Sequence, residues 1–186
     1  YYTEYQHSCG YARRCGLQHS RGKYYFDVDS DTIYPPMYYE LMLDQLMKPG
    51  NVAVSATWSY FPDENHSKLG LRLFEMCRDL FLWIQHFKRP ELSVRGLVFA
   101  YNADYGRQEE YRVDIIRGED GSMALSLKKY GKIKFVRDCR CRAITGYGTI
   151  GNQSMWQSFV QHVKIQSKGI TRIFSKKEHY EDSEDN

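Results

Sequence analysis

The period of the hydrophobic pattern changes near residue 62 of the chain. From Asn51 to Tyr60, apolar and polar residues alternate with the two-residue period of a half-buried strand. Farther on, apolar residues recur every three or four positions from Leu69 to Phe87, which predicts one long amphipathic helix. The residues expected to pack against each other are Leu73, Cys77, Leu80 and Ile84 of the helix and Val52, Val54 and Trp58 of the strand.

Shorter patterns complete the expected fold. A short helix is predicted from Tyr39 to Lys48, where Pro49 and Gly50 end it. The further strands expected are Leu92 to Tyr101, Glu110 to Arg117, Met123 to Lys128 and Lys132 to Arg137, with a turn at Glu119-Asp120-Gly121. The stretch Ser154 to Ile165 fits a helix or a strand. The predicted class is α+β, a mostly antiparallel sheet with one long amphipathic helix packed on it.

The chain divides into four segments by composition. With 186 residues it has the length of one domain. We expect a flexible arm over 1–34, a proline motif and the short helix over 35–50, a globular core over 51–175, and an acidic tail over 176–186.

Composition excludes a disordered chain, since 42% of the residues are hydrophobic and 26% are charged. The five cysteines form an odd number without a framework spacing, and no leader precedes them, which favours a reducing compartment. No apolar run reaches the length of about 18 residues that spans a bilayer.

No set of residues forms a recognisable catalytic motif. The carboxylate pairs Glu109-Glu110 and Glu119-Asp120 fall at predicted strand starts and turns, where solvated acids are common, so an acid/base pair there has no support. The run from Gly146 to Gly151 spells G-x-G-x-x-G but stands alone, which favours a plain glycine turn over a dinucleotide site. We therefore predict a chain that is not an enzyme and has no cofactor.

Cys9, Cys15 and His19 have the spacing of the last three ligands of a C-C-C-H zinc finger. Because no further Cys precedes Cys9 to act as the fourth ligand, unless His7 takes that place, an unliganded aromatic arm is favoured over a zinc site.

Positive charge concentrates between residues 128 and 142. The residues of this basic cluster are Lys128, Lys129, Lys132, Lys134, Arg137, Arg140 and Arg142. They are the candidates for binding an anionic membrane or a nucleocapsid, each charge contributing about 1 kcal/mol at a lipid surface. The alternative is a solubilising edge strand that its lysines protect from pairing.

The sharpest short motif is P-P-x-Y at Pro35, Pro36 and Tyr38. Prolines favour the extended conformation that docks into a WW-domain groove, where Tyr38 would fill a pocket. The other interpretation is a proline pair that introduces the following helix. WW binding requires Tyr38 to be exposed.

The order of an arm, a P-P-x-Y motif, a strand, a long amphipathic helix and further strands resembles the matrix protein of rhabdoviruses. The run from Cys139 to Met155, followed by Trp156 and a charged tail, is similar to the lyssavirus branch. The resemblance covers roughly Asp31 to Asp185.

The resemblance implies a structural protein that forms a homo-oligomeric lattice and bridges the viral nucleocapsid to the anionic inner leaflet of the envelope. It implies budding through host WW-domain ubiquitin ligases, no small-molecule substrate, and a location in the virion, the host cytoplasm and the peripheral membrane. The alternative is a cellular RNA-binding protein with a C-C-C-H zinc finger.

Overall fold

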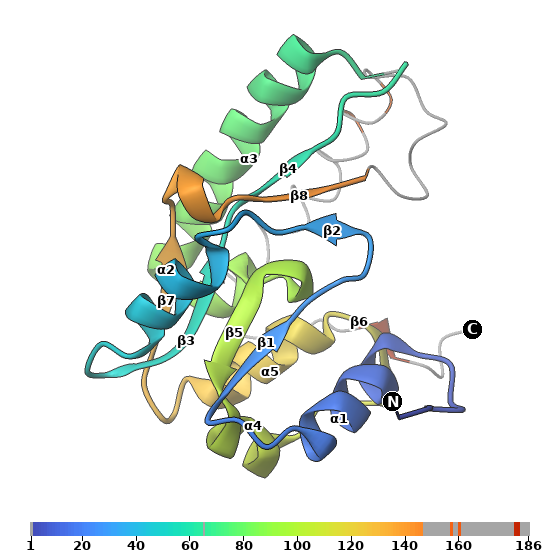
Figure 1. Ribbon diagram of the computed structural model, residues 1–186, viewed down its shortest axis with the longest axis vertical. Coiled ribbons are helices and arrows are strands. Elements are labelled where there is room, and N and C mark those ends of the chain that lie inside the picture. Colours follow the sequence, from blue (N-terminus) through green and yellow to red (C-terminus); the bar gives the residue numbers. More distant parts are fainter. Residues whose placement is uncertain (1, 65, 147–156, 158–159, 161–180, 183–186) are drawn as a thin grey trace.

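The computed structural model describes residues 2–64, 66–146, 157, 160 and 181–182 (Figure 1). The helices are α1 (Cys9–His19), α2 (Tyr38–Leu46), α3 (Lys68–Lys88), α4 (Ala103–Glu109) and α5 (Glu119–Leu127), with short 3-10 turns η1 (Pro90–Ser93), η2 (Gly96–Val98) and η3 (Cys139–Cys141). The strands are β1 (Tyr24–Asp27), β2 (Thr32–Ile33), β3 (Asn51–Ala56), β4 (Trp58–Tyr60), β5 (Phe99–Asn102), β6 (Ile115–Arg117), β7 (Lys132–Val136), β8 (Ala143–Thr145) and β9 (Glu181–Asp182).

The central sheet has the strand order β1-β5-β3-β7. Strand β5 runs antiparallel to both of its neighbours, whereas β3 and β7 are parallel. A second sheet, β2-β8-β4, is also mixed, and β6 pairs with β9. The predicted α+β class is therefore confirmed, but the mostly antiparallel sheet with a single packed helix is wrong. The long connection from β3 to β7 carries several helices and lets the two strands run in the same direction.

Helices cover both faces of the central sheet (Figure 1). Along β5, Phe99 and Tyr101 pack in a cluster with Leu17 of α1 and Leu127 of α5. Ala100, which points to the other face, packs with Tyr38, Met42 and Leu46 of α2 and Leu82 of α3. Because both faces are covered, β3 is buried on both sides and not half-buried as its alternation predicted.

The strongest periodic signals predicted their elements well. Helix α3 and strand β7 lie within one residue of the predicted bounds, and helix α2 lies within two. The predicted strand from Met123 to Lys128 is wrong, because this stretch belongs to helix α5. Gly118, at φ 92°, turns the chain into that helix, and Glu119 and Asp120 place negative charge in its first turn.

The segment 1–34, expected as a flexible arm, contains a helix and an edge strand. Ser8 caps α1 by accepting a hydrogen bond from the backbone N–H of Tyr11, and Leu17 is fully buried. Strand β1 pairs with β5 and so belongs to the central sheet. Of the predicted acidic tail the structure describes only Glu181 and Asp182, which form β9, and most of the stretch from Ser154 to Ile165 lies outside the described residues.

Helix α3 presents the opposite face to the one predicted. Leu73, Cys77, Leu80 and Ile84 are exposed, so their predicted burial is wrong. The buried residues of α3 are Leu71, Phe74, Glu75, Arg78, Asp79, Leu82 and Gln85.

Polar contacts to strand β4 explain this orientation. Arg78 donates to the carbonyl of Trp58 and to Asp79, while Glu75 accepts from the backbone N–H of Tyr60 at 2.8 Å. Since a buried charge needs such partners, these contacts fix which face turns inward. No helix in the described part of the chain is long and apolar enough to cross a membrane.

The orientation of α3 can be tested by two alanine substitutions. Leu82→Ala should lower the free energy of unfolding by about 2–5 kcal/mol, because the side chain is fully buried. Leu80→Ala, at a side chain that is 54% exposed, should change it by less than about 0.5 kcal/mol. Urea denaturation of both variants measures the difference, and the opposite ranking would show that α3 packs through its apolar stripe.

Candidate active site

Acidic side chains gather at the carboxyl end of β1, around the guanidinium of Arg13. Asp27 is the last residue of β1, and Asp29 follows two residues later. Glu119 and Asp120 open helix α5, and Arg13 reaches the same place from α1. Open α/β sheets bind ligands outside the carboxyl ends of their strands.

Arg13 connects three of these carboxylates. Its Nη1 lies 2.8 Å from Oε1 of Glu119, its Nη2 lies 3.6 Å from Oδ1 of Asp29, and its Nε lies 3.8 Å from Oδ1 of Asp27. Gly96 permits this position, because a Cβ there would lie 1.9 Å from Nη2 of Arg13. Burial by itself lowers the pKa of Arg13, but the surrounding carboxylates, Asp27 first, outweigh it and raise the pKa. Arg13 is therefore a permanent cation within this acidic cluster.

Asp27 is the most deeply buried of the four carboxylates, with 3% of its surface exposed. It accepts a hydrogen bond from the hydroxyl of Tyr111, which in turn accepts one from the hydroxyl of Tyr101 at 3.1 Å. Burial raises the pKa of Asp27 to about 7, although Arg13 and the Tyr111 hydrogen bond act in the opposite direction. The pKa of Glu119 is also raised, first by burial and then by the charge of Asp120.

Backbone groups hold the carboxylate of Asp120. Its Oδ2 accepts from the N–H of Gly96 at 2.6 Å, and its Oδ1 accepts from the N–H of Gly121 at 2.7 Å. Unlike Glu119, Asp120 is only partly buried. Its carboxylate is therefore fixed in orientation and still accessible to a bound molecule.

Asp27 and Asp29 are chemically suited to a divalent cation. Oxygen ligands are those that Mg²⁺ and Mn²⁺ prefer, and such ions often take one or two carboxylates and complete their coordination with water and substrate phosphates. Both carboxylates already approach the same positive group, Arg13. Among the residues that the structure describes, no three His, Cys, Asp or Glu side chains form a complete metal site by themselves. The residues thus fit a cation that shares its coordination with a ligand.

The raised pKa of Asp27 predicts a pH dependence of stability. The unfolded chain binds fewer protons than the folded one between the ordinary pKa of an aspartate and about 7, so stability should fall as pH rises through this window. Across this window we expect the free energy of unfolding of the wild-type protein to fall by about 2–4 kcal/mol. Asp27→Asn should remove this pH dependence. Denaturation in EDTA at pH 4.5 and 8 measures it. An unchanged slope in the variant would show that Asp27 is not the titrating group.

The structure buries the residue on which the P-P-x-Y motif depends. Tyr38 is the first residue of α2, has 0% of its surface exposed and packs against Tyr34 and Phe26. The prediction of an exposed Tyr38 is therefore wrong, and in this fold its ring is out of reach of a WW-domain groove. Pro35 and Pro36 introduce the helix, which was the other interpretation of the motif.

The basic cluster does not form one patch. Lys128 pairs with Glu91 at 3.0 Å, Lys129 with Glu109 at 2.8 Å, and Arg140 with Asp138 at 2.7 Å. Arg142 binds Glu75 and Asp79 beneath α3. Of the seven residues of the basic cluster, only Lys132, Lys134 and Arg137 have no carboxylate partner in the described part of the chain.

The residues considered for zinc lie on α1. The Sγ of Cys15 and the Nδ1 of His19 are 3.7 Å apart, as expected for neighbours one helical turn apart. No group of three ligands, with Cys9 or without it, is present in the ranges that the structure describes. The glycine run from Gly146 to Gly151 lies outside these ranges from residue 147 on.

The acidic cluster was missed because its two halves lie in unremarkable stretches. Asp27 and Asp29 fall in the segment expected as an arm, although the run Tyr24-Tyr25-Phe26 before them is a strand signal. Glu119 and Asp120 were interpreted as a solvated turn. A D-x-D sequence at the end of a strand was the available signal, and it required β1 to be recognised as a strand of the main sheet.

The sequence model of the family described as glycosyl transferase family 2 matches residues 1–101, which include Arg13, Asp27, Asp29 and Gly96. The match extends over more than half of the chain, and the chain belongs to this family. No curated protein gave a significant match.

Two solved structures show limited similarity. One is glucosyl-3-phosphoglycerate synthase from Mycobacterium tuberculosis, in complex with Mn²⁺, UDP-glucose and phosphoglyceric acid, at 17% identity and a TM-score of 0.49, covering 77% of this chain and 48% of that one. The other is mannosyl-3-phosphoglycerate synthase from Rubrobacter xylanophilus, at 20% identity and a TM-score of 0.44, covering 92% and 55%. The chain thus spans about half the length of both structures.

The family overturns the viral interpretation. The resemblance to a rhabdovirus matrix protein is wrong, and so are the functions it implied in budding, lattice formation and binding of nucleocapsid, envelope and WW-domain ligases. The alternative of a zinc-finger RNA-binding protein is wrong for the same reason. A family of glycosyl transferases is a family of enzymes, which also corrects the predictions of no enzyme and no small-molecule substrate. A shared order of elements was too weak a criterion to define a family.

Proposed function

We propose that this chain carries donor-binding and catalytic side chains of a glycosyltransferase that moves a sugar from a nucleotide-sugar donor to an acceptor hydroxyl. The observation that carries the proposal is the convergence of Asp27, Asp29 and Glu119 on Arg13, at the carboxyl end of β1 in a chain of this family. Such a donor has a diphosphate leaving group, and the site must therefore stabilise the negative charge of that group.

On the donor side, Asp27 and Asp29 would hold a divalent cation and Arg13 would contact the diphosphate. The cation, when bound, supplies positive charge that stabilises the phosphate leaving group. Arg13 offers a guanidinium whose planar fork suits phosphate oxygens. Glu119, at 2.8 Å from Nη1 of Arg13, keeps that guanidinium oriented.

On the acceptor side, Asp120 would act as the general base. An acceptor hydroxyl gives its proton to the carboxylate while its oxygen bonds to the anomeric carbon of the sugar. The bond between that carbon and the phosphate oxygen breaks, and its electron pair leaves with the diphosphate. The backbone N–H groups of Gly96 and Gly121 fix the carboxylate in position for this proton transfer.

Release of the nucleoside diphosphate tests the proposal. The purified protein is incubated with Mn²⁺ or Mg²⁺ and a panel of nucleotide sugars, and the released diphosphate is quantified. We expect at least one donor to be hydrolysed slowly without acceptor, and the release to stop in EDTA. Failure to bind or cleave any member of the panel, by a protein shown to be folded, would contradict the assignment.

A further inference from the structure

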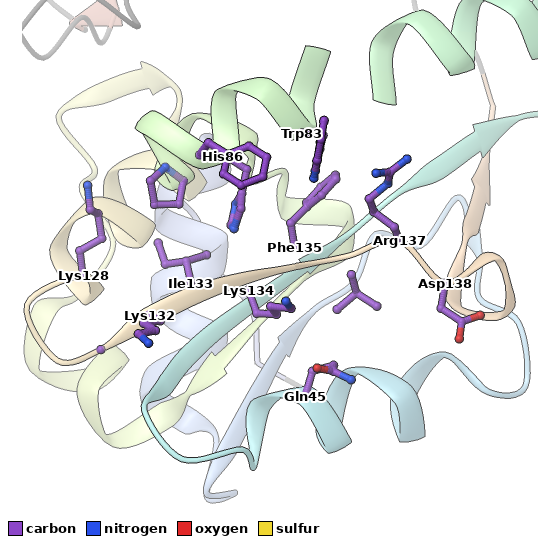
Figure 2. A pocket seen from close by; sticks show the side chains of 14 residues that line it. Gln45, Trp83, His86, Lys128, Lys132, Ile133, Lys134, Phe135, Arg137 and Asp138 are labelled. Atoms are coloured by element: carbon purple, nitrogen blue, oxygen red, sulfur yellow. The ribbon is translucent and has the colours of Figure 1, made fainter. Parts of the chain in front are cut away.

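A groove of about 860 Å³ lies at the opposite edge of the central sheet from the acidic cluster. Strand β7 forms its floor, the C-terminal half of α3 and the turn η1 form one wall, and Gln45 of α2 lies on the other side (Figure 2). Because β1 and β7 are the two outer strands of the sheet β1-β5-β3-β7, an occupant of this groove would leave Asp27 and Asp29 free.

Within the described residues, no strand pairs with the outer edge of β7, which lies along the groove. Strand β7 pairs with β3 on one side and is the last strand of the described sheet on the other. An edge strand presents a row of backbone N–H and C=O groups to which an extended peptide can add as a further strand. The alternative role of an edge rich in lysine is protection from such pairing.

The two sides of β7 differ in chemistry. Figure 2 shows Lys132 and Lys134 on the side of Gln45, and Phe135 and Arg137 on the side of Trp83 and His86. Both lysines are exposed and, within the described residues, have no carboxylate partner. Lys132 and Lys134 both line the groove. One side of β7 therefore attracts carboxylates.

The other side is aromatic. Trp83 is 37% exposed and Phe87 is 70% exposed, with ring centroids 4.8 Å apart. The guanidinium of Arg137 lies 5.3 Å from the centre of the Trp83 ring. Among the described residues, Asp138 is the one acid that lines the groove, and it forms a salt bridge with Arg140 at 2.7 Å. This wall offers apolar area to side chains that point toward α3.

We propose that this groove is a docking site for an extended acidic peptide of a partner protein, which adds to the outer edge of β7. Successive side chains of a strand point to opposite sides, so carboxylates at every second position would meet Lys132 and Lys134. The apolar residues between them would pack on Trp83 and Phe87. Backbone pairing supplies affinity, and the alternation supplies specificity.

A fluorescent ten-residue peptide of alternating glutamate and valine tests the proposal by anisotropy. We expect it to bind the wild-type protein at low salt, and a peptide of the same composition with all glutamates in one block to bind at least about tenfold more weakly. Equal binding of the two peptides would indicate charge attraction alone and would overturn strand addition. Absence of binding would leave β7 as a protected edge and would also overturn the proposal.

Variants then locate the binding. The double change Lys132→Glu and Lys134→Glu should lower the affinity for the peptide of alternating glutamate and valine by more than about tenfold. The same variant should gain affinity for a peptide of alternating lysine and valine. The matched control is Lys23→Glu with Lys68→Glu, at lysines that do not line the groove. Trp83→Ala should weaken binding, whereas Leu69→Ala, at an exposed apolar residue of α3 outside the groove, should not. If the control changes have the same effects as the groove changes, the peptide binds elsewhere and the proposal fails.

Discussion

Asp120→Asn should lower sugar transfer about 10²–10⁴-fold, the range by which a positioned general base accelerates a reaction. Asparagine has nearly the shape of aspartate, but it has only one side-chain oxygen, so it can keep only one of the two hydrogen bonds that Gly96 and Gly121 donate to Asp120. What it lacks is the ability to accept the proton of an acceptor hydroxyl. The loss should therefore appear in kcat, with the KM for the donor nearly unchanged, in steady-state assays of the best donor in the panel.

Asp29→Asn should lose activity for a different reason. Its side chain is 42% exposed, so the substitution should leave the midpoint of thermal unfolding nearly unchanged while it weakens the retention of a divalent cation. Raised Mn²⁺ should restore part of the activity of this variant but none of that of Asp120→Asn. Asp31→Asn, two residues farther along the same D-V-D-S-D run, is the matched control and should stay active. Equal losses of activity in Asp29→Asn and Asp31→Asn would mean that activity depends on the total negative charge of this run and not on Asp29 as a cation ligand.

The elements that the sequence predicted correctly are those whose own residues determine them. Helix α3 has a sustained helical period, and β7 has the alternation Lys132-Ile133-Lys134-Phe135. Helix α2 ends where Pro49 and Gly50 follow. In each case short-range spacing was sufficient, because no distant partner was needed to choose between helix and strand.

The face of α3 could not be predicted from its period. The helix has an apolar stripe through Leu73 and Leu80, and burial of such a stripe is the usual outcome. Here the inner face carries Arg78 and Asp79, whose partners lie on β4 and near β8, far away in the sequence. The orientation thus depends on a network of buried charges that the pattern of one helix does not contain.

The candidate active site also depends on contacts between residues that are far apart in the sequence. Arg13, Asp27 and Glu119 come from three elements, and Glu119 is more than a hundred residues after Arg13. No short motif joins them, and each looks solvated in its own stretch. Only the pairing of β1 with β5 and the packing of α5 bring them together. The family match then indicated the class of reaction, glycosyl transfer, for which this cluster of residues is a candidate site.

Arg13→Met should lower the free energy of unfolding by about 3–5 kcal/mol at pH 8, the usual cost of removing one partner from a buried ion pair. Methionine fills much of the space of the arginine stem but leaves Asp27 and Glu119 buried without a cation. The loss should be smaller at pH 5 than at pH 8, because protonation of Asp27, whose pKa is about 7 with Arg13 present, removes the uncompensated charge. Chemical denaturation at pH 8 and pH 5 measures both values.

The double variant Arg13→Met with Asp27→Asn separates electrostatics from packing. If the buried charge of Asp27 causes the loss, the second substitution should restore a substantial part of the stability at pH 8 and little at pH 5, where Asp27 is already largely protonated. Arg14→Met is the matched control, since Arg14 lies over the ring of Tyr11 and not beside a carboxylate, and it should change stability by less than about 1 kcal/mol. A loss in Arg13→Met that is independent of pH and unaffected by Asp27→Asn would mean that Arg13 acts by filling space between α1 and η2. The carboxylates would then not depend on it for charge compensation.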